Sequence, residues 1–372
     1  MADTTAALAP SNAEAFRVDP NPNPASAEQR EELVARMDFG KSFTDHMARV
    51  TWRHGEGWDD RRVEAYAPLT LDPAAAVLHY AQEIFEGLKA YRWEDGSLWL
   101  FRPQANAERF QRSARRLALP ELSVEDFIGS VEALVRTDAA WVPGVDESSL
   151  YLRPFMFAAE AFLGVRPAHH VEYLMIASPV GPYFPGGVKP VSIWVAQGFH
   201  RSGPGGTGDA KCGGNYAASL LPQMQAYENG CQQVLFLDAR EDKYFEELGG
   251  MNVVAVMADG SVVTPRLTGT ILEGITRSSV MQLLEDDGRK IIEKDITLDE
   301  VRDGIESGDI AELFACGTAA VVTPVGQLKS PTFDLTINGG AAGELTMAVR
   351  KRLTDVQYGR AGDTYGWMRR VV

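Results

Sequence analysis

The sequence predicts a mixed α/β protein, close to the α+β class, made of two domains. Its 372 residues are more than one domain usually contains. Segments with the alternating apolar pattern of strands are mixed with segments of helical spacing, without a regular strand–helix–strand alternation. The stretch GPYFPGGVKP is dense in glycine and proline and is the best candidate for an interdomain loop. We therefore expect a flexible arm over 1–25, a small domain over 26–180, the loop over 181–190 and a large domain over 191–372.

The N-terminal arm is rich in alanine, proline and asparagine, which favours a loose segment. Ser26 and Gln29 then form a capping box that predicts a helix near 27–37. In the segment LKAYRWEDGSLWLFRP, two apolar-alternating runs flank an Asp-Gly pair, which predicts a β-hairpin. The other elements expected in the small domain are a helix in AERFQRSARRLAL and strands at 149–159 and 171–180.

The large domain is expected to begin with the strand VSIWVA. Thr297 and Glu300 form a second capping box, before a helix that runs to about residue 307. The further elements expected here are, in order, a helix near 216–229, strands at QVLFLDA, MNVVAVMAD and SVVTP, a helix at GITRSSVMQLLEDD, strands at ELFACG and AVVTPV, and a final helix in AAGELTMAVRKRLTDVQYG.

Composition and charge exclude several classes of partner. The formal net charge of −15 argues against nucleic acid or an anionic membrane as the main partner, since both require a basic surface. Three cysteines give neither a disulfide framework nor a C-x-x-C pair. The N-terminal stretch has no basic residue before Arg17 and no continuous apolar core, so we expect neither a signal nor a transit peptide. No apolar run approaches the length of a membrane span, and we expect a cytoplasmic protein.

One lysine, Lys211, lies in the segment GGTGDAKCGGNY, where five of twelve residues are glycine. A P-loop needs Gly before the lysine and Ser or Thr after it, but Ala210 and Cys212 stand there. The run from Gly203 to Gly208 matches the dinucleotide fingerprint G-x-G-x-x-G. That motif must open a helix, however, and Pro204 with further glycines occupies the place of the helix.

Two interpretations of this lysine then remain. A solvated lysine on a mobile glycine-rich loop is the plain structural one. The other is a Schiff-base lysine, which must be partly desolvated so that its amine can be neutral. Small neighbours on both sides would let backbone and a flat ring approach such an amine closely.

The rest of the chain favours the reactive lysine. AKCGGNYAASL is followed in order by EELGGMNV (246–253) and LEGITR (272–277). With these motifs the chain resembles the fold-type IV pyridoxal-phosphate enzymes and, among them, the branched-chain amino-acid aminotransferases. Further matching motifs are FGKSFTDHM, LHYAQEIFEGLKAYR, LFRPQANAERF, SLYLRPF, SPVGPYFPGG, GTGDAKCGGNY, FACGTAAVVTPV and QYGR.

The resemblance implies a pyridoxal 5'-phosphate site. Lys211 would form the Schiff base and then move a proton between the substrate Cα and the cofactor. Glu247 matches the acid beside the ring nitrogen, whereas a surface carboxylate describes Glu246 better. Tyr216 matches the tyrosine at the ring hydroxyl. The apolar residue packed on the ring matches Leu272.

The resemblance also implies which residues bind the cofactor phosphate. Arg109 matches the family's phosphate arginine, and its spacing from FEG favours it over the nearby Arg102. Ile275 and Thr276 would bind phosphate through backbone N–H groups at the start of a helix. Thr318 matches a further phosphate ligand.

For the substrate, the resemblance implies a largely aromatic cage and a carboxylate-binding turn. Thr318 and Ala319 match the turn that takes the substrate carboxylate. Arg153 would help to hold the side-chain carboxylate of glutamate. The remaining pocket positions are Phe39, Tyr80, Phe85, Tyr151, Val165 and Tyr183, each of which taken alone could be a core residue. Tyr80 and Val165 match residues that reach the neighbouring subunit's site, which implies a homodimer.

These features predict transamination between the branched-chain L-amino acids Leu, Ile and Val and 2-oxoglutarate. Another fold-type IV enzyme, such as a D-amino-acid transaminase or an aminodeoxychorismate lyase, is the nearest alternative. A nucleotide-dependent oxidoreductase using the run from Gly203 to Gly208, and a non-enzymatic binding protein, are alternatives of other classes. Mammalian relatives carry a cysteine pair where this chain has Ala320 and Thr323, so we expect no thiol regulation of that kind.

Overall fold

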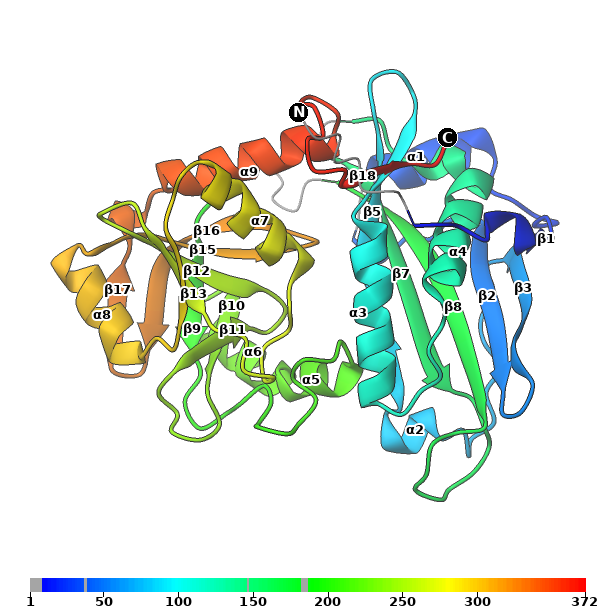
Figure 1. Cartoon of the computed structure of the whole chain (residues 1–372), viewed down its shortest axis with the longest axis horizontal. Helices are drawn as coiled ribbons and strands as arrows, with labels where there is room; N and C mark the ends of the chain where they lie inside the picture. Colours follow the sequence, from blue (N-terminus) through cyan, green and yellow to red (C-terminus); the bar gives the residue numbers. More distant parts are fainter. Residues whose placement is uncertain (1–8, 37–38, 146, 182–186) are drawn as a thin grey trace. The chain divides into compact units, whose positions relative to one another are not determined.

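The computed structural model describes residues 9–36, 39–145, 147–181 and 187–372. The chain forms two compact units (Figure 1). The first comprises Met1–Pro182 with Asp355–Val372, and the second comprises Tyr183–Thr354. Helices and strands are mixed in both, which confirms the expected fold class. In the described part of the chain, no helix is both long and apolar enough to cross a membrane.

The first unit contains a sheet in the order β1-β3-β2-β8-β7-β5-β6-β18, with β4 added beside β7. All neighbours are antiparallel except β1 and β3. The strands are β1 (Arg17–Val18), β2 (His46–Arg53), β3 (Gly57–Ala65), β4 (Glu83–Phe85), β5 (Leu88–Arg92), β6 (Leu98–Phe101), β7 (Ser149–Ala158), β8 (His170–Val180) and β18 (Met368–Arg370). The helices are α1 (Ala27–Arg36), α2 (Val77–Tyr80), α3 (Pro103–Arg116) and α4 (Val124–Thr137).

Helices α3 and α4 cover one face of this sheet, as Figure 1 shows beside β7 and β8. Phe110 of α3 and Phe127 of α4 contact Tyr173 of β8, with ring centroids 5.7 and 6.4 Å away. Met156 of β7 pairs with Tyr173, so the even-numbered residues of β7 face the helices. Tyr151 and the other odd-numbered residues of β7 therefore lie on the opposite face.

The second unit contains a mixed sheet in the order β11-β10-β9-β16-β15-β12-β13-β14, with β17 beside β16. The pair Glu247–Asn252 also joins β11 to β12, which closes six of these strands into a ring. The strands are β9 (Val191–Val195), β10 (Gln233–Leu237), β11 (Phe245–Leu248), β12 (Asn252–Met257), β13 (Val262–Pro265), β14 (Ile291–Lys294), β15 (Ile310–Gly317), β16 (Val321–Ser330) and β17 (Phe333–Thr336). The helices are α5 (Gly213–Ala218), α6 (Leu220–Glu228), α7 (Ile275–Asp286), α8 (Leu298–Ser307) and α9 (Glu344–Gln357).

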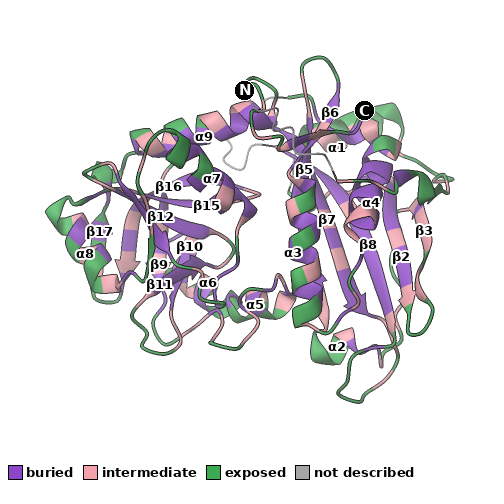
Figure 2. Ribbon diagram, viewed as in Figure 1, coloured by how far each residue is buried: buried purple, intermediate pink, exposed green. Residues whose placement is uncertain are grey.

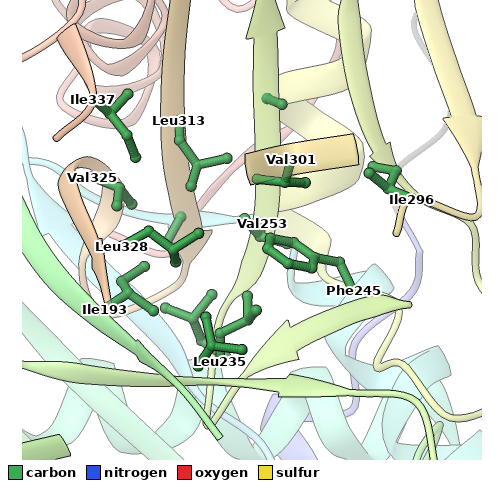
Figure 3. Close-up of a cluster of buried hydrophobic side chains, with 14 of the residues drawn as sticks. Ile193, Leu235, Phe245, Val253, Ile296, Val301, Leu313, Val325, Leu328 and Ile337 are labelled. Atoms are coloured by element: carbon green, nitrogen blue, oxygen red, sulfur yellow. The ribbon is translucent and has the colours of Figure 1, made fainter. Parts of the chain in front are cut away.

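One apolar cluster joins all six strands of the ring. Figure 3 shows Ile193, Leu235, Phe245, Val253 and Leu313 among its members, with Val325 from β16. Val301 of α8 belongs to the same cluster. Figure 2 shows the consequence: strands of both units are largely buried, and helices expose one side.

Several predicted elements are confirmed. In the first capping box, the Gln29 N–H donates to Ser26 Oγ at 3.2 Å and the Ser26 N–H donates to Gln29 Oε1 at 2.9 Å. The second capping box, before α8, is complete as well. The predicted hairpin is formed by β5 and β6. The helix expected near 216–229 is two helices, α5 and α6, because Pro222 has no N–H to continue the first one.

Both ends of the chain differ from the prediction. Within the described part of the expected arm, residues 9–25 pack on the first unit, because Phe16 is buried and β1 pairs with β3. The alanine, proline and asparagine content of this segment concealed that apolar anchor. At the other end, β18 pairs with β6 of the first sheet, so residues 355–372 lie with the first unit and not with the second. Residues 182–186 of the expected interdomain loop lie outside the described residues.

Candidate active site

Lys211 lies directly before α5, and its Nζ donates a hydrogen bond to the Tyr216 hydroxyl at 2.6 Å. Asn215 fastens the loop that carries the lysine. Its Nδ2 donates to the carbonyl oxygens of Ala210 (2.9 Å) and Thr207 (2.7 Å), and its Oδ1 accepts from the Thr207 hydroxyl at 2.7 Å. These bonds tie down the loop that carries the lysine, which favours the reactive lysine over a solvated lysine on a mobile loop.

Two of the glycines near Lys211 are required for different structural reasons. A Cβ on Gly208 would lie 2.3 Å from the Thr270 carbonyl oxygen, so only glycine allows these backbones to meet. Gly205 has a φ of +74°, a conformation that favours glycine. The first requirement comes from the contact of the loop with Thr270, and the second comes from the left-handed backbone conformation at Gly205.

Glu247 of β11 is buried, with 2% of its surface exposed. Its Oε1 accepts from Arg201 Nη1 at 2.9 Å and from the Leu272 N–H at 2.7 Å. Burial raises the pKa of Glu247 to about 7, and the Arg201 charge opposes that rise. Arg201 also donates to the carbonyl oxygens of Gly208 and Thr270, so it links the lysine loop to the carboxylate. No sequence motif pointed to this arginine, and our prediction missed it.

Glu246, the neighbour of Glu247, is not the surface carboxylate that we expected. Only 5% of its surface is exposed, because β11 is part of the closed ring of strands. It accepts a hydrogen bond from the Thr270 hydroxyl, and burial raises the pKa of its carboxyl.

Leu272, Ile275 and Thr276 lie together at the start of α7 and are buried. Asn252 Nδ2 donates to the Leu272 carbonyl at 3.0 Å, which ties this segment to β12. A Cβ on Gly274 would lie 2.0 Å from Asn252 Oδ1, so a larger residue at this position would have to displace the Asn252 side chain. Backbone N–H groups in the first turn of a helix have no intrahelical acceptor and suit an anion.

Thr318 and Ala319 form the turn between β15 and β16. Val321, which follows it, has a φ of +61°, a strained value for a β-branched residue. Arg350 of α9 donates through Nη1 to the carbonyl oxygens of Ala320 and Val322, both at 2.9 Å. A buried arginine that sequence reasoning also missed thus ties the end of this turn to α9.

In the first unit, Arg109 is buried on α3 and makes an ion pair with Glu86, with Nε 2.7 Å from Oε1. The odd-numbered face of β7 carries Tyr151 and Arg153. Arg153 Nη2 donates to the Tyr151 hydroxyl at 3.0 Å, and the guanidinium lies 4.7 Å from the centre of the Phe85 ring.

A cavity of about 180 Å³ lies on this face. Its lining residues are Phe39, Gly40, Phe43, Tyr151, Arg153, Ile176, Ala177 and Ser178. Within the described residues, Arg153 Nε and Ser178 Oγ are buried without a hydrogen-bond partner. Such groups normally bind water or a ligand. Two larger cavities, of 510 and 430 Å³, are lined by none of the predicted site residues.

Three predicted pocket residues, Tyr80, Phe85 and Val165, are not in the lining of that cavity. Tyr80 and Val165 are 42% and 88% exposed, on α2 and on the segment between β7 and β8. Tyr183 lies outside the described residues. In the described part of the chain, no group of three or more His, Cys, Asp or Glu residues could hold a metal ion.

Comparison with known proteins identifies the family. Residues 83–328 match the family model of amino-transferase class IV. The branched-chain-amino-acid aminotransferase of Mycolicibacterium smegmatis is 54% identical over 360 residues, which are 96% of this chain and 98% of that protein. A branched-chain amino acid aminotransferase from T.th. has been solved with pyridoxamine 5'-phosphate (TM-score 0.72) and with N-(5'-phosphopyridoxyl)-L-glutamate (0.71). Both structures are 27% identical and cover 87% of this chain and 99% of their own. The chain therefore belongs to the class IV aminotransferases, and within them to the branched-chain-amino-acid aminotransferases.

Proposed function

We propose that this enzyme moves the amino group between the branched-chain L-amino acids Leu, Ile and Val and 2-oxoglutarate, with pyridoxal 5'-phosphate as cofactor. The observation that carries the proposal is the 2.6 Å contact between Lys211 Nζ and the Tyr216 hydroxyl, on a loop joined by Arg201 to the buried Glu247. The named relatives support the substrate class.

The residues present fit the cofactor. Glu247 would pair with the ring nitrogen, Tyr216 with the ring hydroxyl, and Leu272 would pack on the ring. Arg109, Thr318 and the N–H groups of Ile275 and Thr276 would hold the phosphate. When bound, the cofactor supplies the electron sink for the reaction.

Lys211 is the catalytic acid and base of the proposal. Its Nζ would take the proton from the substrate Cα and deliver it to the cofactor. The Tyr216 hydroxyl orients Nζ through the hydrogen bond already present. The N–H groups of the turn at Thr318 and Ala319 hold the substrate carboxylate.

Substrate choice follows from the small cavity on the first unit. Apolar and aromatic groups dominate its lining, which suits an aliphatic side chain. One methylene changes binding by only about 1–3 kcal/mol, so Leu, Ile and Val are accepted together. Arg153, whose Nε lacks a partner among the described residues, would receive the side-chain carboxylate of glutamate.

We further propose a cytoplasmic homodimer with shared active sites. The large exposed surfaces of Tyr80 and Val165 support this, because neither side chain is used in the core of its own chain. Cys212, Cys231 and Cys316 are all buried free thiols, which fits a reducing compartment.

The visible absorption spectrum of the purified protein tests the function. The expected result is a yellow band that bleaches with L-leucine and returns with 2-oxoglutarate, and that is missing from Lys211→Ala. A band that responds only to D-alanine would favour a D-amino-acid transaminase instead. A protein that stays colourless when given the cofactor would remove Lys211 from its role.

A further inference from the structure

Glu86 follows β4 in the motif FEG, and its carboxylate is fully buried against Arg109 of α3. Glu86 Oε1 accepts from Arg109 Nε at 2.7 Å, and Oε2 accepts from Arg109 Nη2 at 2.9 Å. Oε2 also accepts from Asn106 Nδ2 at 2.7 Å and from the Gly87 N–H at 3.1 Å. Two motifs far apart in sequence, FEG and NAER, thus meet in one hydrogen-bonded cluster.

This pairing fixes the direction of the guanidinium. Glu86 occupies the edge formed by Nε and Nη2, and the planar group then directs its Nη1 side away from the carboxylate. Asn106 lies one helical turn before Arg109 on the same face of α3, where it holds the carboxylate in turn.

A buried ion pair is a poor source of stability, because well-packed apolar residues of similar volume often do as well. A fixed cation is nevertheless what the recognition of a phosphate requires. We infer that Glu86, supported by Asn106, is a positioning residue that orients Arg109 toward the cofactor phosphate without touching it. This inference rests on the proposed role of Arg109.

The direction in which phosphate affinity changes distinguishes a positioning role of Glu86 from a purely electrostatic one. Removing the negative charge of Glu86 would by itself strengthen the attraction between Arg109 and an anion. Weaker phosphate binding after this change therefore has to come from the lost orientation.

The test uses the full-length apoprotein and compares Glu86→Gln with wild type. Dissociation constants are measured spectroscopically for pyridoxal 5'-phosphate and for pyridoxal, which lacks the phosphate. We expect the constant for the phosphate form to rise about tenfold or more, since charge-assisted bonds are lost, while that for pyridoxal stays unchanged. Glu108→Gln, on the exposed side of α3, is the matched control and should change neither constant.

Two further variants make the result decisive. Asn106→Ala keeps both charges and should give a smaller loss in the same direction, which tests the inference where Glu86→Gln fails to fold. If Arg109→Gln binds the phosphate form as wild type does, the proposed role of Arg109 is wrong. If Arg109→Gln weakens binding but Glu86→Gln and Asn106→Ala do not, only the positioning role of Glu86 is wrong.

Discussion

Glu247 makes the stability of the apoprotein depend on pH. Burial raises its pKa from the usual 4.5 to about 7, so ionising it costs more in the folded state than in the unfolded state. The protonated folded form is favoured below the usual pKa, and this contribution is lost as the pH rises toward 7. This contribution to the free energy of unfolding is at most on the order of 3 kcal/mol. We expect the melting temperature of the wild-type apoprotein to fall over this window relative to that of Glu247→Gln.

The comparison needs the slope with pH, because Glu247→Gln also changes the hydrogen bonds with Arg201 and with the Leu272 N–H, and this effect is separate from the titration of the carboxyl. Differential scanning calorimetry of both apoproteins over this range gives that slope. If the melting temperatures of the two apoproteins changed in parallel with pH, Glu247 would not titrate in this pH range.

Single residues also show what a sequence can reveal about a site. Lys211 and Tyr216 are five positions apart, so a local motif contains both of them. Arg201 and Glu86 act through partners far along the chain, and they depend on the ring of strands and on the packing of α3. Their own neighbours in sequence carry no signal of that pairing, which is why only the structure reveals it.

At the scale of elements, the two capping boxes offer a matched pair. Helix α8 buries Val301 in the apolar cluster of the second unit, whereas α1 has no buried residue. Loss of an N-cap costs about 1 kcal/mol, but it reaches the global transition only where the helix is part of the core. We expect Thr297→Ala to lower the melting temperature of the second unit by about 2–4 °C.

Ser26→Ala is the control for Thr297→Ala and should leave the melting temperature unchanged while α1 frays. Hydrogen exchange of the amides of α1 and α8 detects the local effect in each variant. Equal shifts of melting temperature in the two variants would show that α1 is coupled to the core after all.

Elements with strong local signals were predictable, and those stabilised by distant partners were not. The hairpin of β5 and β6 has its turn residues and its apolar alternation in one short segment. Strands β2 and β3 were missed because β3 is rich in charged residues, such as Arg62 and Glu64, which form an ion pair on its surface. Their pairing is completed by β8, which comes much later in the chain.

At the scale of the whole molecule, an exposed apolar stripe on α6 bears on the proposed homodimer. Leu220, Met224 and Tyr227 are 65%, 57% and 63% exposed, and their spacing places them on one face of the helix. Soluble chains seldom leave such a face to water unless a partner covers it. We expect α6 to lie in the contact between two copies of this chain.

Sedimentation velocity at micromolar concentration tests this expectation. The wild type should be a dimer, and Leu220→Lys with Met224→Lys should shift it to the monomer because two buried ammonium groups would cost far more than the lost apolar contact. Both positions are exposed, so each chain keeps its fold, which circular dichroism checks. Val18→Lys changes an exposed valine on β1 and is the control that should remain a dimer. A doubly substituted protein that stays dimeric would place the contact elsewhere, and a fully active wild-type monomer would refute the shared active sites.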